Sequence, residues 1–586
     1  MSFVSYRNTL LAGVVAVIAT TGASAQGRHA DHPGHAACGM AAMASYDRDA
    51  LLENTRAANP TLFDRITGKR AAAGALAASD LELTFLVRNR VTNQLEEING
   101  VLVYDGIFAR VWVDVRDTTK ASLKPTSTQM RTLFRALDTA VVQTNVTPRD
   151  RNQGILKNDI DVFGDIPRTY NVENKTDFLL LDIKDAVAGQ NVLGYFSPTD
   201  QLAKTTAGES NEMNLLYIDS KEGFQQMQTL LAIIAHEFQH LIHYGRHPRT
   251  GGDDIARDVA LNEGMSEVAS ILNGYHFRSN SSYLANTNIS MFDWHYSEAN
   301  AQEADYQRAM TFAHYLSEHY GERFLYELVG STLDNMPRLS DALRRYGLPE
   351  SYDFREVLKG FAVANYLQTS SNPSFGYDYK LKGGAARPHS TSTGTGFPAT
   401  GSAVIQPYGT YYIQYSNPGP MRFRFSGSSE IKAMLIGIRS LDTAVVELQP
   451  DTDYTLPLWE GGAYDRVVVA LISTAGGVRE ASWTASALTS GVAGEAGAAS
   501  TMRIDAAHVD ANATATIDYT VGSSAPVRLD LFDVRGERVL TIVDGQSRAA
   551  GSHREVVALD DLASGSYVAR LVQNGAVVST MILVAR

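Results

Sequence analysis

The sequence predicts a multidomain protein in which an α+β domain is followed by two small β-sandwich modules. The chain has 586 residues, which at about 150 residues per domain corresponds to three or four modules. Strand-like apolar runs and long helical patterns extend to about residue 367, and short strand patterns dominate after residue 402. A hydrophobic content of 44% and a charged content of 20% exclude a collagenous, coiled-coil or wholly disordered chain.

Residues 1–25 have the pattern of a secretory signal peptide. Arg7 precedes an apolar run at 10–19, and Ala23-Ser24-Ala25 provides a small-x-small cleavage site. A membrane anchor is the less favoured alternative, because the run is shorter than the ~20 apolar residues that span a bilayer. We therefore expect export through the periplasm and no transmembrane segment in the mature protein.

The next segments are an extension and a candidate catalytic domain. Residues 26–79 are rich in Ala, His, Asp and Arg and resemble a propeptide. Residues 80–382 combine an N-terminal mixed sheet with a helical part. The sheet is expected from strand patterns at 82–87, 106–115, 178–181 and 215–218, and the helical part from helical patterns at 224–367.

Small and polar residues divide the rest of the chain. Gly, Ser, Thr, Pro and Ala predict linkers at 383–401 and 488–502. Between them, strand patterns at 402–487 predict a β-sandwich accessory domain without a chemical motif of its own. Residues 503–586 are expected to form a last β module.

An apolar helical pattern at 230–242 contains the motif His-Glu-x-x-His at 236–240. Positions i and i+4 lie on one helix face, so His236 and His240 can bind one Zn²⁺, and Glu237 can act as general base toward a zinc-activated water. A chance match in this chain has an expectation of roughly 0.02. A buried histidine pair is the alternative, although such polar groups in an apolar helix are costly unless paired or metal-bound.

A third ligand is expected on the next helical pattern. The metzincin spacing fails, because His243 and Arg246 occupy its Gly and third His positions. Glu263 and Glu267 are again i and i+4, so Glu263 can complete a His₂Glu site. Glu267 can then accept a hydrogen bond from the outer nitrogen of a ligand histidine. An exposed acidic helix face is the alternative for both.

The segment Asn262-Glu263-Gly264-Met265-Ser266-Glu267, after the first motif, resembles the gluzincin zinc metallopeptidases. Within them the chain is most similar to the hyicolysin family, over roughly residues 80–370. The resemblance implies a zincin-like fold, one catalytic Zn²⁺ and peptide-bond hydrolysis. It also implies matching roles for two ligand histidines, a ligand glutamate and a general base: His236, His240, Glu263 and Glu237.

A donor for the oxyanion is expected downstream. Residues 305–316 are similar to the segment of aminopeptidase-type gluzincins in which a tyrosine at a helix start donates its hydroxyl to the oxyanion. The resemblance makes Tyr306 the candidate. Packing of this side chain at a helix end is the alternative.

The single cysteine, Cys38, excludes an intramolecular disulfide and a Cys-based structural zinc site. It lies among three histidines within residues 29–40. Because a thiolate is a strong zinc ligand, Cys38 is a candidate latency switch of a zymogen, and Lys69-Arg70 offers a basic site for removing the extension. A solvated tail is the favoured alternative.

The C-terminal module alternates apolar and polar residues at 527–531, as half-buried antiparallel strands do. Its segments 533–539 and 562–567, which read D-V-R-G-E-R-V and L-A-S-G-S-Y, look like the type IX secretion sorting domain. This resemblance implies a Gram-negative exporter, with the type IX machinery as partner and a secreted or cell-surface destination. A carbohydrate-binding or structural sandwich is the alternative.

Together these patterns predict a secreted zinc-dependent endopeptidase that acts on proteins or peptides. An excess of 64 acidic over 51 basic residues, a net charge of −13, argues against nucleic acid as a partner. No motif indicates a structural Ca²⁺ or the binding of a peptide terminus, as an exopeptidase would require. The alternative function is a non-hydrolytic, zinc-stabilised surface or adhesion protein that binds partners through its β modules.

Overall fold

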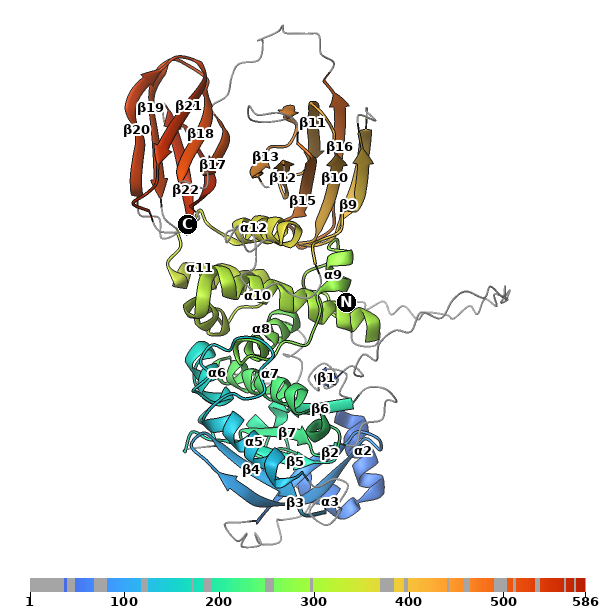
Figure 1. Ribbon diagram of the computed structural model, residues 1–586. Coiled ribbons are helices and arrows are strands. Elements are labelled where there is room, and N and C mark those ends of the chain that lie inside the picture. The colour runs from blue at the N-terminus through green and yellow to red at the C-terminus, as the bar shows by residue number, and fades with distance from the viewer. Residues whose placement is uncertain are drawn as a thin grey trace, which may run out of the picture.

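The computed structural model shows a multidomain chain with helices and several separate β-sheets (Figure 1). The predicted signal peptide and Lys69-Arg70 lie outside the residues that it describes. No helix of the described residues is long and apolar enough to cross a membrane. The described residues are 36–38, 48–67, 82–116, 125–170, 173–183, 191–247, 258–295, 299–368, 384–394, 399–439, 442–456, 464–488, 503–509, 513–532, 538–562, 565–573 and 576–584.

Within these ranges, the N-terminal part is built on a seven-stranded sheet of order β1-β6-β7-β5-β4-β3-β2. Strands β4, β5 and β7 are parallel to one another, β6 is antiparallel to β7, and β1 is parallel to β6. The sheet is therefore mixed. Its strands are β1 (Ala36–Cys38), β2 (Glu82–Asn89), β3 (Gln94–Asp105), β4 (Ala109–Asp114), β5 (Thr176–Leu181), β6 (Asn191–Phe196) and β7 (Leu215–Asp219).

The central strand β5 is apolar on both sides because both faces of the sheet are covered. Phe178 and Leu180 join the core that faces the helices, and Leu179 and Leu181 join a second core on the opposite face. Strands buried on both faces have continuous apolar runs rather than alternating ones. The sequence run at 178–181 therefore marks the middle of the sheet.

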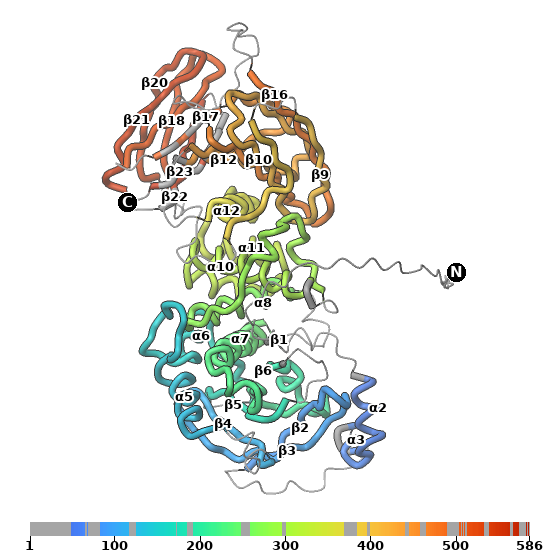
Figure 2. The backbone as a smooth tube through the Cα atoms, turned by 45° about the vertical axis from the view of Figure 1, so that its right-hand side comes forward, coloured from blue at the N-terminus to red at the C-terminus, as the bar shows by residue number. Residues whose placement is uncertain are grey.

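Helices cover one face of the sheet and form the middle of the molecule (Figure 2). Helix α7 packs against β6, α8 packs against α7, and α10 packs against α8. Helix α10 is kinked at Gly321, where φ is 75°. The α-helices that follow β4 in the described sequence are α5 (Ser127–Asp138), α6 (Ile155–Phe163), α7 (Met227–Arg246), α8 (Val259–Leu272), α9 (Ser281–Ala285), α10 (Ala299–Val329), α11 (Asn335–Tyr346) and α12 (Phe354–Leu367).

Two glycines allow the elements around α7 and α8 to approach closely. A Cβ at Gly194 in β6 would lie 3.1 Å from Ile233 Cγ2 of α7. A Cβ at Gly264 in α8 would lie 2.6 Å from the carbonyl oxygen of Ala309 in α10. Since real Cβ atoms do not tolerate 2.6 Å to a backbone oxygen, the spacing of α8 and α10 depends on this glycine.

The first β-sandwich begins earlier than the sequence predicts. Strand β8 and the start of β9 lie within the predicted linker 383–401, because their Thr and Ser residues pair with β10 and β16. The two sheets have the orders β13-β12-β15-β10-β8 and β14-β11-β16-β9. Their strands are β8 (Ser390–Thr393), β9 (Ala399–Ile405), β10 (Thr410–Ser416), β11 (Met421–Gly427), β12 (Ile431–Arg439), β13 (Asp442–Leu448), β14 (Tyr454–Leu456), β15 (Arg466–Ser473) and β16 (Arg479–Ala487).

The five-stranded sheet of this sandwich also packs on the helical part. Ile413 of β10 faces the sandwich core, while its neighbour Tyr412 joins the core of the helical part. The Tyr412 hydroxyl donates to the carbonyl oxygen of Ala362 in α12 at 2.5 Å. Lys359 of α12 forms an ion pair with Glu447 at 2.6 Å. The sandwich and the helical part therefore share a continuous core.

The C-terminal module is a second sandwich with a core of its own. Its sheets have the orders β17-β18-β21 and β20-β19-β22-β23. Val527, Leu529 and Leu531 of β19 are fully buried. Asp530 between them is also buried, and its carboxylate forms an ion pair with Arg528 at 2.7 Å. The strands are β17 (Arg503–Val509), β18 (Thr514–Val521), β19 (Ala525–Phe532), β20 (Arg538–Arg548), β21 (Gly551–Ala558), β22 (Gly565–Gln573) and β23 (Ala576–Val584).

Candidate metal centre

Helices α7 and α8 bring two histidines and a glutamate together. His236 and His240 lie one turn apart on α7, and Glu263 lies on α8. Glu263 Oε2 is 3.1 Å from His236 Nε2 and 3.6 Å from His240 Nε2. The ligand atoms of the three residues all lie within 4.8 Å of one another, and all three side chains are buried.

The geometry of this cluster fits a metal ion. Ligand atoms at about 2.0–2.2 Å from a tetrahedral Zn²⁺ are about 3.3–3.6 Å apart. The measured 3.1 and 3.6 Å bracket these separations. Two imidazole nitrogens with one carboxylate are also a donor set that Zn²⁺ accepts, so the His236–His240–Glu263 group is a possible metal-binding triad.

The outer nitrogens of the two histidines have hydrogen-bond partners of their own. His236 Nδ1 lies 3.5 Å from Glu267 Oε1. His240 Nδ1 lies 3.1 Å from Asn262 Oδ1 and 3.1 Å from Ser266 Oγ. Because a carboxylate or amide oxygen accepts the proton of Nδ1, the Nε2 atoms of both rings face Glu263 and the centre of the triad.

Electrostatics keep Glu263 ionised. Burial raises its pKa, but the neighbouring His240 and His236 outweigh burial and lower the pKa of Glu263 to about 2. A carboxylate that stays charged in a buried site is available as a ligand over the whole physiological pH range.

Glu237 is hydrogen-bonded to strand β6 of the sheet. The backbone N–H of Phe196, the last residue of β6, donates to Glu237 Oε2 at 3.0 Å. The side chain is fully buried and next in sequence to His236. The residue expected from the sequence to be the general base thus follows a residue of the triad directly and is hydrogen-bonded to strand β6.

Arg278 joins the site through Glu267. Its Nε donates to Glu267 Oε1 at 3.0 Å, and its Nη1 pairs with Glu303. Burial raises the pKa of Glu267, but Arg278 and His236 together outweigh burial and hold that pKa below its usual range. The arginine therefore maintains the carboxylate that faces His236.

Tyr306 lies beside the triad, in the interior of α10 rather than at its start. Its ring centroid is 6.5 Å from that of His236 and 5.0 Å from that of Trp294. The guanidinium of Arg278 lies 4.5 Å from the Tyr306 ring centroid, as in a cation–π pair. The structure thus places Tyr306 near the triad, in contact with Arg278 and beside His236.

Cys38 is described only by its backbone. It ends β1, which pairs with β6 so that Cys38 lies opposite Gly194. Gly194 lies two residues before Phe196 in β6, and the Phe196 N–H contacts Glu237. Cys38, the candidate latency residue, therefore pairs with β6 close to this contact.

Sequence reasoning assigned no role to three residues of the site, although two of them belong to the quoted motif. Asn262 and Ser266 are i and i+4 on α8, so they share the face of the predicted motif, and this spacing could have indicated their contact with His240. Arg278 had no local signal, since its partners lie 11 and 25 residues away in the sequence.

Comparisons with known proteins do not assign the chain to a family. No protein-family model matches the chain, and no curated protein matches it. Among solved structures it is similar to the Salmonella Typhimurium lysozyme inhibitor PliG, with TM-score 0.13 and 18% identity over 17% of this chain and 96% of that one. It is also similar to the adhesin domain of Epf from Streptococcus pyogenes, with TM-score 0.12 and 10% identity over 32% and 76%. TM-scores of this size carry no argument about fold or function.

Proposed function

We propose that this chain is a zinc-dependent endopeptidase with a zincin-like catalytic domain, in which His236, His240 and Glu263 hold one Zn²⁺. The observation that carries the proposal is the pairing of this triad with a buried glutamate, Glu237, that follows the first ligand directly. Three protein ligands are the usual set of a catalytic zinc, whereas structural sites are closed by four. Within the described residues, the triad gains no fourth His, Cys, Asp or Glu ligand.

The bound ion supplies Lewis acidity, which polarises a carbonyl and makes water acidic. Glu237 transfers the proton that water loses to the amine that leaves. Its Oε2 accepts a hydrogen bond from the Phe196 N–H at 3.0 Å, which helps to orient the carboxylate that takes a proton from water. The same carboxyl returns this proton to the leaving amine.

Tyr306 and Arg278 support the reaction in different ways. Tyr306, beside the His236 ring, donates its hydroxyl to the oxyanion of the reacting carbonyl. Arg278 keeps Glu267 ionised, and Glu267 orients His236 through Nδ1. Arg278 is therefore a positioning residue and does not touch the substrate.

The proposal includes the route of export. The sequence patterns of residues 1–25 and of 503–586 support an exported protein that carries a type IX sorting module. The module has a hydrophobic core of its own, separate from that of the catalytic part, as a sorting domain that is removed after export would require. Mass spectrometry of the protein secreted by a type IX-competent host tests this, with loss of residues after about 500 expected and an intact C-terminus contradicting it.

The decisive experiment compares the full chain with Glu237→Ala. Casein cleavage is measured with Zn²⁺ and with a chelator, before and after limited trypsin digestion that is then stopped with an inhibitor. We expect cleavage only by the wild type with Zn²⁺. Glu350→Ala, at an exposed glutamate after α11, is the matched control and keeps full activity.

Zinc content and thermal stability separate the peptidase from the non-hydrolytic alternative. Both functions predict about one bound Zn²⁺ per chain and a higher melting temperature with Zn²⁺. If the wild type binds Zn²⁺ in this way but cuts no protein under any of these conditions, the peptidase proposal is wrong. The zinc-stabilised binding protein then remains.

A further inference from the structure

Strand β6 would form the edge of the sheet beside the metal triad if β1 were absent. The order β1-β6-β7 places β6 between a three-residue strand and the rest of the sheet. One end of β6 reaches the site, since the Phe196 N–H donates to Glu237. The middle of β6 lies against α7, where Gly194 meets Ile233. The backbone N–H and C=O groups along β6 therefore end at Phe196, which contacts Glu237, the proposed general base.

Strand β1 fills this edge with a segment of the chain's own N-terminal extension. The pairing is parallel, with Ala36 opposite Asn191, Ala37 opposite Val192 and Cys38 opposite Gly194. The strand therefore runs toward the Phe196 end of β6. It also contacts α7, the helix that carries His236.

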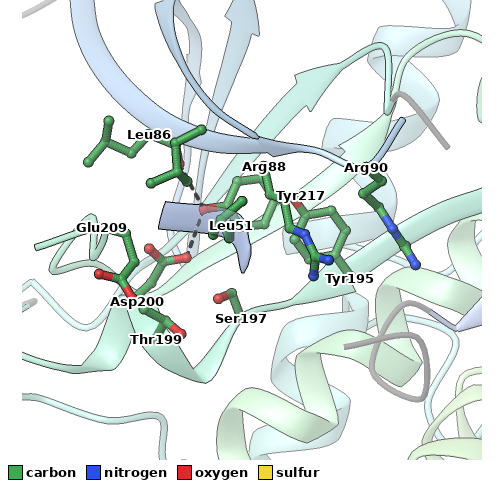
Figure 3. Close-up of a pocket in the computed structure, with 11 residues that line it drawn as sticks. Leu51, Leu86, Arg88, Arg90, Tyr195, Ser197, Thr199, Asp200, Glu209 and Tyr217 are labelled. Carbon is green, nitrogen blue, oxygen red and sulfur yellow. Dashed lines mark hydrogen bonds between the residues drawn. The ribbon is translucent and has the colours of Figure 1, made fainter. Parts of the chain in front are cut away.

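A second contact anchors the same extension to the sheet. Leu51 of α2 (Arg48–Ala58) and Leu62 of α3 (Pro60–Ile66) are buried against Leu95 of β3. The Thr55 hydroxyl accepts a hydrogen bond from the Leu95 N–H at 2.9 Å. Figure 3 shows Leu51 of the extension in the wall of a small pocket whose other walls include Tyr195 of β6.

The two contacts act together. A three-residue strand is too short to hold an edge alone, but a segment tethered by docked helices pairs at a high effective concentration. An open strand edge binds extended peptides through backbone hydrogen bonds. A segment paired with β6 consequently competes with any peptide that would use this edge to reach Glu237.

We infer that β1 is an inhibitory strand that occupies the peptide-binding edge of β6 and keeps the site closed while the extension is attached. The inference rests on the proposed peptidase function. It assigns latency to backbone pairing of Ala36–Cys38 and not to the Cys38 thiol. Activation then requires β1 to leave β6, as cleavage between the extension and β2 would permit.

Proline substitution in the full chain tests this directly. Ala36→Pro with Ala37→Pro removes two N–H donors and prevents strand pairing, whereas Ala36→Val with Ala37→Val keeps the donors and is the matched control. We expect initial rates of casein cleavage at least about tenfold higher for the proline variant, because a few backbone hydrogen bonds are lost from the closed state. The valine variant is expected to match the wild type.

A binding measurement keeps the test independent of hydrolysis. In the Glu237→Ala background, fluorescence anisotropy compares the binding of a labelled casein peptide with and without the two prolines. Hydrogen exchange follows the backbone amides of β6. We expect about tenfold tighter binding and faster exchange of these amides when the prolines are present.

The outcomes separate the two proposals. If no variant cuts casein but the prolines tighten peptide binding and expose the β6 amides, β1 still blocks the β6 edge, and it is the peptidase proposal that is wrong. If casein is cut but the prolines change neither rate nor binding, the inhibitory strand is wrong. If Cys38→Ser activates the enzyme and the prolines do not, the thiol is the inhibitor and the inference is overturned.

Discussion

Replacement of Arg278 by methionine removes the arginine charge that pairs with Glu267 while keeping much of the side-chain volume. The Arg278 side chain is 6% exposed, that of Glu267 is 3% exposed, and Nε lies 3.0 Å from Oε1. Because the change leaves a buried carboxylate without its cation, we expect the free energy of unfolding to fall by about 3–5 kcal/mol. Urea denaturation of the metal-free protein measures this change.

The same change is expected to weaken metal binding. Without Arg278, the pKa of Glu267 rises because burial is no longer opposed by the arginine charge. Glu267 then holds His236 Nδ1 less firmly. We expect Zn²⁺ affinity to fall about 10–100-fold, as is usual when a partner of a ligand histidine is lost. Competition with a chromophoric chelator gives this affinity.

An exposed ion pair provides the control. Arg355 pairs with Asp353 at a site where the arginine side chain is 52% exposed, so Arg355→Met is expected to cost less than about 1 kcal/mol. Combining Arg278→Met with Glu267→Gln removes the uncompensated charge and is expected to restore part of the stability. If Arg278→Met costs no more than Arg355→Met and leaves Zn²⁺ affinity unchanged, the argument from the buried ion pair is refuted.

Three further changes have defined outcomes. Tyr306→Phe should lower kcat about 100–1000-fold with KM and zinc content little changed, since it removes only the oxyanion donor; steady-state kinetics check this. Gly264→Ala places a Cβ 2.6 Å from the Ala309 carbonyl and should cost about 1–3 kcal/mol in urea denaturation, whereas Gly427→Ala, with its nearest atom at 3.4 Å, should cost little. Burial raises the pKa of Asp200 from 3.8 to about 6. Folded Asp200 therefore keeps a proton that the unfolded chain has released between about pH 4 and 6, and its contribution to stability is full below pH 4 and lost as the pH rises through 6. Relative to the wild type, Asp200→Asn should gain about 3 kcal/mol between pH 4 and 7, and an unchanged difference in urea denaturation would contradict this.

The metal triad was predictable because its spacing is local. His236 and His240 share a helix face by the 3.6-residue period alone. Glu263 required the further step of pairing α8 with α7, which the second motif suggested and the distances of 3.1 and 3.6 Å now describe. Arg278 is different, because a loop residue before α9 reaches Glu267 only through the fold.

The strands that the sequence did not predict share one physical feature. β1 reads Ala-Ala-Cys and has no strand pattern, so it exists only through its pairing with β6. β3 contains two glutamates, an asparagine and a glycine, and it is held between β2 and β4. β8 reads Ser-Thr-Ser-Thr, which is typical of a linker until it is paired with β10. In all three, tertiary pairing outweighs local propensity.

The extent of the first sandwich follows from the same reasoning. Composition alone made residues 402–487 a separate accessory domain. However, its five-stranded sheet is buried on both faces, with Ile413 in one core and Tyr412 in the other. A surface buried in this way cannot also bind a partner, since exposing it would uncover apolar area on both the sandwich and α12. The sandwich therefore stabilises the helical half that carries Glu263 and Tyr306, whereas the described residues of the C-terminal module contribute nothing to the core of that half.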